Sequence, residues 1–378
     1  MPRPAPFHAL PAQPGLPALK GRGSVRIVPH RYEVWQRETA DDGWGTHEDE
    51  GHKEDAPRIA TQVQEVLCKS AINRNESPDL GFMHSVNPYR GCEHGCSYCY
   101  ARPGHSYLNL SPGLDFETRL IAKTNVAEVL RRELLAPSYV PGKLVLGGVT
   151  DVYQPIDKHY GLTRQLLTVL HELKHPVGLV TKGALIERDL DLLAQMSQWQ
   201  GVAVYITLTT LDAELARRLE PRAASPAKRL SLMRRLSEAG VRVGVSVSPQ
   251  IPFINVDLEQ CLAAAREAGA RNAFYTVLRL PLELETVFQD WLLTHYPERA
   301  ERVMNRVRDL HGGRNYRSEF GLRHTGQGVW AQLLAQRFAK ACARLGLVRE
   351  STPLNTDLFV GRAQAVAPAT AQQAHLDF

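Results

Sequence analysis

The sequence predicts an α/β protein in which a parallel sheet curls towards a partial barrel and a helical extension follows. From about residue 84 to residue 280, short β-branched runs alternate with amphipathic helical stretches. Strand–helix–strand units joined by right-handed crossovers build a parallel sheet, and six of them would curve into a partial (β/α)6 barrel. After residue 280 the alternation stops and only helical patterns remain, so we expect these helices to cap the sheet.

The elements are short and well separated along the chain. The expected strands are residues 85–86, 144–149, 177–181, 202–208, 241–248 and 273–278. Between them apolar residues recur at helical spacing, as at Leu162, Leu166 and Leu170. The helical extension is expected over residues 282–294, 297–310 and 329–345.

Composition indicates a folded protein whose two terminal segments are poorly ordered. The chain has 378 residues, 43% of them hydrophobic, and a net charge of +5, which permits a polyanionic partner without requiring one. No apolar run is long enough for a membrane span or a signal peptide, so we expect a cytoplasmic protein with reduced thiols. We expect a largely disordered extension over residues 1–65, a core over 66–282, a helical cap over 283–350 and a flexible tail over 351–378. Within the extension, residues 21–35 are less polar and could dock on the body.

Three of the six cysteines lie within eight residues, at Cys92, Cys96 and Cys99. Three thiolates on one loop can hold three irons of a [4Fe-4S] cluster and leave the fourth iron open for chemistry, whereas an electron-transfer cluster normally takes four. A closed zinc site is the alternative, because His84, His94 and His105 are near in sequence.

Each predicted strand ends in glycine or polar residues. Gly147 and Gly148 end the second strand, and Thr150 and Asp151 follow it directly. Lys182 follows the third strand, and Thr207 and Thr209 lie at the end of the fourth. The carboxyl ends of parallel barrel strands line active sites, so these residues are expected around one polar cavity, although turns alone also favour such residues.

The cysteine spacing, with Tyr98 before the last cysteine, resembles the radical S-adenosylmethionine (SAM) superfamily. The stretch from Asn87 through Tyr100, together with motifs near residues 111–116, 150–155, 220–223 and 278–281, is similar to the DNA-repair-photolyase-like relatives of spore photoproduct lyase. The resemblance implies a [4Fe-4S] cluster that cleaves SAM reductively to methionine and a 5′-deoxyadenosyl radical, which abstracts a hydrogen atom from substrate. A lyase is one expected outcome.

The resemblance also implies roles for single residues. Cys92, Cys96 and Cys99 would be the cluster ligands and catalytic centre, and Tyr98 would pack near the adenine. The other expected cofactor contacts are Gly147, Gly148, Thr150 and Asp151 at the methionyl ammonium, Lys182 at its carboxylate, and Thr207 and Thr209 at the ribose. Arg222 and Arg279 are weaker candidates for substrate contact. Spore photoproduct lyase carries a hydrogen-donating cysteine where this chain has Gly148.

The substrate and partners stay open at this stage. The resemblance implies a reducing partner such as flavodoxin or ferredoxin and favours a nucleic-acid substrate. Two arginine-rich regions, residues 217–235 and 299–323, could grip phosphates or could form solvated helix faces. Two alternatives remain: a nucleic-acid-binding module with a structural zinc on the same cysteines, and a radical SAM enzyme that modifies a peptide or metabolite.

Overall fold

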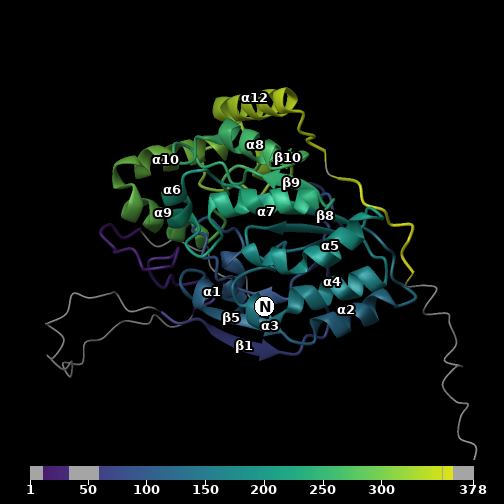
Figure 1. The fold of residues 1–378 in the computed structure, drawn as a ribbon. Coiled ribbons are helices and arrows are strands. Elements are labelled where there is room, and N and C mark those ends of the chain that lie inside the picture. The colour runs from purple at the N-terminus through teal and green to yellow at the C-terminus, as the bar shows by residue number, and fades with distance from the viewer. Residues whose placement is uncertain (1–11, 34–58, 351, 361–378) are drawn as a thin grey trace, which may run out of the picture.

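A seven-stranded sheet forms the centre of the computed structural model, which describes residues 12–33, 59–350 and 352–360 (Figure 1). Its strands, in spatial order, are β10 (Asn272–Phe274), β9 (Arg242–Ser246), β8 (Val202–Thr207), β7 (Val177–Thr181), β6 (Leu144–Leu146), β3 (His84–Val86) and β2 (Ile72–Arg74). The strands from β3 to β10 are parallel, and β2 pairs antiparallel with β3. The six predicted strands and the partial barrel are therefore confirmed. The sheet is open, because β2 and β10 end its strand order.

An outer layer of helices covers this sheet (Figure 1). The helices are α2 (Val126–Leu134), α4 (Leu162–Glu172), α5 (Leu190–Ser197), α7 (Pro226–Glu238) and α8 (Leu258–Glu267). In α4, Leu162, Leu166 and Leu170 lie four residues apart on one buried face, as an amphipathic helix requires. In α7 the Ser225 hydroxyl accepts a hydrogen bond from the Lys228 amide, which satisfies one of the free amides at the helix start.

A second, three-stranded sheet was not expected from the sequence. It consists of β1 (Gln62–Val66), β5 (Arg119–Lys123) and β4 (Tyr89–Arg90), in the order β1–β5–β4. The strand β1 is mostly polar and half-exposed, so it carries no buried apolar run that would reveal it. Short helical turns connect the remaining elements: η1 (Arg102–Leu108), α1 (Asp115–Thr118), α3 (Asp157–Tyr160), η2 (Ala184–Asp189) and α6 (Ala213–Leu219).

The C-terminal helices divide into two groups. The first, α9 (Leu284–His295) and α10 (Pro297–Leu310), packs Phe288, Trp291 and Val303 into a core that also holds Cys96 and Tyr98. The last helix, α12 (Gly328–Leu345), follows the short α11 (Leu322–Thr325) and packs on α8. The predicted helices are confirmed with boundaries shifted by at most two residues. The helices α9 and α10 thus share a core with the cysteine region.

The described part of the N-terminal extension docks on the body. In residues 12–33 the side chains of Arg22, Ser24 and Val28 are buried. The expected docking of residues 21–35 is therefore seen over 21–33. Most of the expected disordered extension and flexible tail lies outside the described residues, and the expected domain boundaries stay predictions. In the part of the chain that the structure describes, no helix is long and apolar enough to cross a membrane.

The packing of α9 predicts a large loss of stability for Trp291→Ala. The indole is fully buried and its Nε1 donates to the Arg218 carbonyl at 2.9 Å. We expect the free energy of unfolding, measured by urea denaturation, to fall by about 3–5 kcal/mol. Leu333→Ala on the exposed side of α12 is the control and should change it by less than about 0.5 kcal/mol. A Trp291→Ala protein as stable as the control would contradict this packing.

Candidate active site

The three clustered cysteines lie on one tightly turned loop, residues 91–100, which follows β4. The Gly95 amide donates to the Cys92 carbonyl and the Cys99 amide donates to the Cys96 carbonyl, both at 3.3 Å. Gly95 has a φ of +66°, a conformation that L-residues with side chains rarely adopt. The loop therefore folds back on itself.

The thiols are shielded from water and reduced. Cys92 and Cys96 are buried, and Cys99 packs against the apolar groups around both of them. All three are free cysteines. Burial raises the pKa of Cys92 well above its usual value and raises the pKa of Cys96 to about 12, although nearby Lys182 favours the Cys96 thiolate. Iron binding would supply the positive charge that a buried thiolate needs.

The donor set fits a cluster better than a single ion. Among the described residues no three His, Cys, Asp or Glu side chains converge on a position for one metal ion. Thiolates that bind different irons need not converge on one point, and thiolates are the usual ligands of iron–sulfur clusters. His94, the histidine inside the loop, lies with its Nδ1 3.3 Å from Asp151 Oδ2 and is thus held against that carboxylate.

Asp151 joins the loop to the third strand of the barrel. Its carboxylate accepts hydrogen bonds from the Thr181 hydroxyl at 2.6 Å and from the Lys182 amide at 2.8 Å. Burial alone would raise the pKa of Asp151, but attraction to His94 and these hydrogen bonds lower it to about 2. The carboxylate is therefore charged and already has protein partners. Its expected contact with the methionyl ammonium stays a prediction.

Lys182 reaches the cysteine loop directly. Its ammonium lies 3.4 Å from Cys96 Sγ, 3.1 Å from the Tyr98 hydroxyl and 5.2 Å from the centre of the Tyr98 ring. Although burial would lower the pKa of Lys182, attraction to Cys96 and Glu220 raises it. The side chain is thus a buried cation beside the thiols, and the expectation that it approaches the cofactor site is consistent with this position.

Glu220 is a central residue that sequence reasoning missed. Its buried carboxylate accepts hydrogen bonds from Tyr98, from Thr209 at 2.6 Å and from Arg229, and lies 3.5 Å from the Lys182 ammonium. Burial would raise the pKa of Glu220, but Arg229 and Lys182 hold it well below its usual range. The site therefore contains a charged carboxylate that two cations neutralise.

The burial of Arg229 removes it from both interpretations of residues 217–235, a surface that grips phosphates and a solvated helix face. Arg229 is almost fully buried and also donates to the Thr207 carbonyl at 3.1 Å. A signal for this was present in the sequence: Arg229 shares its helix face with Leu232, Met233 and Leu236, all of which are buried. An arginine on an apolar stripe implies a buried acidic partner.

Gly147, Gly148 and Arg279 lie near the mouth of the barrel, which is the edge of the sheet where its parallel strands end and the cysteine loop lies. Gly147, with a φ of +90°, comes so close to β7 that an added Cβ would lie 2.8 Å from the Val180 carbonyl oxygen. The Gly148 carbonyl accepts a hydrogen bond from Tyr100, whose ring stacks with the Arg279 guanidinium at 4.3 Å. The structure thus brings the ends of β6 and β10 to the cysteine loop.

Three predicted residues have partners within the protein. The Thr150 hydroxyl donates to the Tyr89 carbonyl at 3.4 Å. Thr207 is buried and its carbonyl accepts from Arg229, whereas Arg222 pairs with Glu93 at 2.9 Å. Their expected contacts with SAM or substrate, like those of Tyr98 and Thr209, stay predictions.

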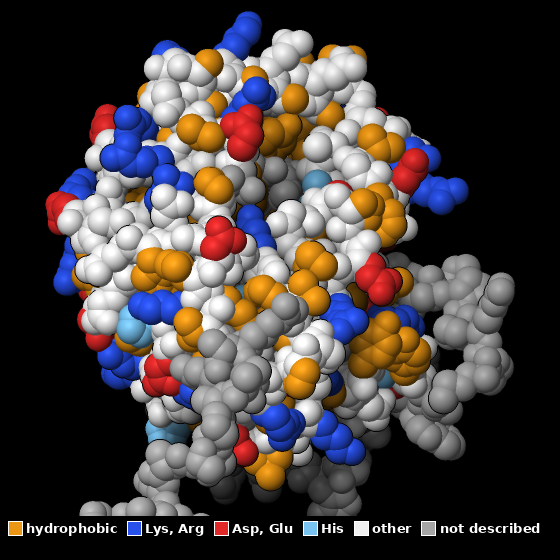
Figure 2. All heavy atoms as spheres, turned by 90° about the vertical axis from the view of Figure 1, so that its right-hand side faces the viewer, with side chains coloured by type: hydrophobic (Ala, Val, Ile, Leu, Met, Phe, Trp, Pro, Cys, Tyr) orange, Lys and Arg blue, Asp and Glu red, His pale blue; other side chains and the backbone are white. Residues whose placement is uncertain are grey.

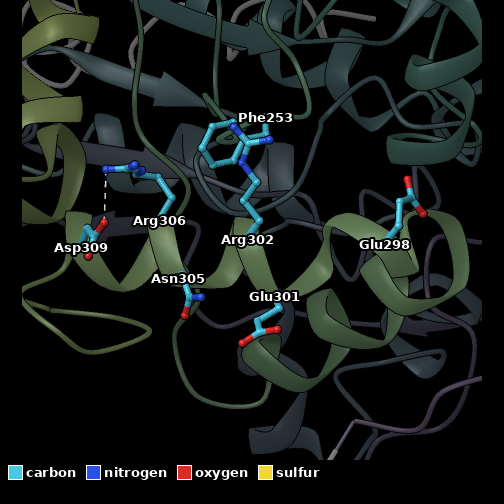
Figure 3. A pocket seen from close by; sticks show the side chains of 7 residues that line it. All are labelled: Phe253, Glu298, Glu301, Arg302, Asn305, Arg306 and Asp309. Carbon is cyan, nitrogen blue, oxygen red and sulfur yellow. Dashed lines mark ion pairs between the residues drawn. The ribbon is translucent and has the colours of Figure 1, made fainter.

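A hollow of about 550 Å³ lies on α10 and is separate from this site (Figure 3). Its lining contains no cysteine-loop or strand-end residue. The Arg302 guanidinium lies 4.0 Å from the centre of the Phe253 ring, and Arg306 pairs with Asp309 at 3.2 Å. In the same helix Arg299 pairs with Glu298 at 3.4 Å. The helix-face interpretation therefore describes residues 299–309 better than a basic patch does. Figure 2 shows another face of the molecule, on which basic and acidic side chains are also interspersed.

Comparisons with known proteins agree with this geometry. The family model of the radical SAM superfamily matches residues 86–268. An uncharacterised protein of Mycobacterium tuberculosis is 39% identical over 251 residues, which are 65% of this chain and 73% of that protein. An uncharacterised protein of Methanocaldococcus jannaschii is 27% identical over 246 residues, with 65% of this chain and 88% of that protein covered.

Solved structures show the same fold. Spore photoproduct lyase, in a mutant with bound AdoMet and a dinucleoside spore photoproduct, superposes with a TM-score of 0.55 at 14% identity, covering 77% of this chain and 82% of that chain. The chain belongs to the radical SAM superfamily. Its cofactors are accordingly a [4Fe-4S] cluster and SAM.

The Glu220 network predicts that Glu220→Gln is strongly destabilising. The substitution leaves the buried charges of Arg229 and Lys182 without their counter-ion, so the free energy of unfolding should fall by about 3–5 kcal/mol in a denaturant titration. Glu214→Gln removes an exposed partner of Arg218 and should cost less than about 1 kcal/mol. Equal losses of unfolding free energy in the two variants would contradict a special contribution of the Glu220 network to stability.

Proposed function

We propose that this chain is a radical SAM enzyme whose cluster is held by Cys92, Cys96 and Cys99. When bound, the [4Fe-4S] cluster supplies one electron that cleaves SAM into methionine and a 5′-deoxyadenosyl radical, which abstracts a hydrogen atom from the substrate. The observation that carries this proposal is the position of three free thiols on one loop at the mouth of the parallel sheet, beside Lys182 and Gly148.

The residues around the loop would bind and orient SAM. Lys182 is proposed to pair with the methionyl carboxylate, because its buried ammonium lies beside the thiols. Gly147 and Gly148 would let the backbone approach the methionyl ammonium, with Thr150 and Asp151 behind them. Tyr98, Thr207 and Thr209 are proposed for the adenosine end. The protein would thus supply binding and water exclusion around the reacting bond.

A nucleic acid or nucleotide is the proposed substrate class, with a lyase-type reaction. The support is the fold shared with spore photoproduct lyase, whose structure contains a dinucleoside substrate. Arg279 stacked on the half-exposed Tyr100 gives the mouth a cation and an aromatic face, which suit a phosphate and a base. Since Gly148 has no thiol, any hydrogen atom returned to the product would come from another group.

The proposed cluster also suggests a source of the electron and a cellular compartment. A low-potential protein such as flavodoxin or ferredoxin is proposed as the reducing partner. We propose a cytoplasmic location, because a cluster held by thiolates needs a compartment that keeps cysteines reduced.

Loss of one ligand should abolish the chemistry. We expect Cys96→Ala protein, reconstituted anaerobically with iron and sulfide and then reduced, to form no 5′-deoxyadenosine from SAM, as followed by chromatography. Cys261→Ala is the matched control, since Cys261 is a buried thiol in the core of α8 and should be dispensable for the reaction. Wild-type product levels in the Cys96→Ala protein would refute the proposed cluster ligands.

Replacement of Lys182 should weaken SAM binding. A charge-assisted hydrogen bond contributes about 1.5–3 kcal/mol, so Lys182→Met should raise the Kd for SAM by about 10- to 100-fold. Binding to the reconstituted protein can be measured by equilibrium dialysis. Lys182→Arg keeps the positive charge and should retain more of the affinity. An unchanged Kd in Lys182→Met would assign Lys182 to the Glu220 network alone.

A further inference from the structure

The N-terminal segment Arg22–Ser24 lies directly on the cysteine loop. Gly23 is so close to the backbone of residues 95–97 that an added Cβ would lie 1.7 Å from the Gly95 carbonyl oxygen and 3.2 Å from the Ser97 amide nitrogen. The obstacle is backbone, so no side chain can swing away to make room. Only glycine fits at position 23.

One buried carboxylate holds the two segments together. Glu117 accepts hydrogen bonds from the Gly23 amide at 2.9 Å and from the Ser24 amide at 2.8 Å. The same carboxylate lies under the loop, because an added Cβ on Gly95 would lie 2.6 Å from Glu117 Oε2. Glu117 is fully buried, so these contacts are made without competition from water.

Arg102 completes the connection to a cluster ligand. Its guanidinium pairs with Glu117 at 2.5 Å and its Nε donates to the Cys96 carbonyl at 2.9 Å. From the other side, Arg22 donates to the Glu117 carbonyl at 2.9 Å and to the Thr61 hydroxyl at 3.1 Å. Apart from the neutral Thr61 hydroxyl, each of these groups is charged or is backbone, so the arrangement has both strength and direction.

The segment is also tied to the helical extension. Arg26 pairs with Asp290 at 2.7 Å and Arg31 pairs with Glu283 at 2.8 Å. Both acidic partners are almost fully buried in and beside α9. The chain thus runs from α9 to the cysteine loop and is held at both ends.

We propose that residues 22–31, with Glu117 and Arg102, form a clasp that holds the cysteine loop in its cluster-binding shape and shields it from solvent. Gly23 and Glu117 are its positioning residues. The inference rests on the proposed function in one respect only, namely that the loop receives a cluster. A loop that contains glycines and small residues would otherwise be free to rearrange when no iron is bound.

The test compares Gly23→Ala with Gly81→Ala in the full chain. Gly81 has no atom within 4 Å of an added Cβ and a φ outside the left-handed region, so it is the matched control. In cluster-free protein the alkylation rates of Cys92 and Cys96 are followed by mass spectrometry of peptides. In reconstituted protein the loss of cluster absorbance in air is followed. Gly23→Ala should raise both rates by about tenfold, with little change in Gly81→Ala.

Glu117→Gln tests the same clasp without adding bulk. The amide nitrogen of glutamine would face either the Gly23 or the Ser24 donor, and the charge opposite Arg102 would be lost. It should raise the same two rates, whereas Glu259→Gln, at a surface pair with Arg337, should not. This variant decides the question if Gly23→Ala does not fold.

The outcomes separate the clasp from the proposed function. Folded Gly23→Ala and Glu117→Gln proteins whose two rates stay within about twofold of wild type would overturn the clasp. A wild-type chain that takes up no iron would overturn the proposed function, yet faster alkylation in Gly23→Ala would still support the clasp. If wild-type protein shows slow alkylation and a stable cluster, and the two variants lose these two properties, the result would support the clasp and the proposed function together.

Discussion

The buried carboxylate of Glu220 is the interaction around which the candidate site is arranged. It receives hydrogen bonds from Tyr98 on the cysteine loop, from Thr209 after β8 and from Arg229 on α7, and it attracts Lys182 after β7. A carboxylate taken out of water is unfavourable unless it is paired and hydrogen-bonded, so each partner must be present for the others to be stable. The geometry of the loop and that of the barrel mouth are therefore coupled.

Two further buried carboxylates support the loop from other sides. Asp151 holds His94 and the start of the segment after β7. Glu117 lies against Gly95 and is connected through Arg102 to the carbonyl of Cys96. A loop of ten residues with three thiols has little apolar surface of its own. Because charged hydrogen bonds are directional, they can set the positions of its backbone where packing alone cannot.

The sequence predicted the repeating parts of the fold and only some of the site. Strands and helices such as α4 were predictable because their apolar residues recur with the period of the element. The strand β1 was not, because it is polar and gains its order from pairing with β5. The strand-end residues Gly148, Asp151 and Lys182 lie beside the loop, since parallel strands bring their carboxyl ends together, and their roles at the cofactor stay predictions. The roles of Glu220, Glu117 and Gly23 were not predicted, because these residues act through partners distant in sequence. Among the residues of the Glu220 network, Arg229 carried a local sign of burial, its place on an apolar helix face.

The most direct test is the electron paramagnetic resonance spectrum of the reduced, reconstituted protein with and without SAM. A cluster with one iron free to bind SAM should give a [4Fe-4S]⁺ signal that changes when SAM is added, and wild-type protein should show that change. A cluster signal unaffected by SAM would contradict the open iron. A colourless protein that holds one zinc per chain would contradict the cluster itself and make the cysteine loop structural.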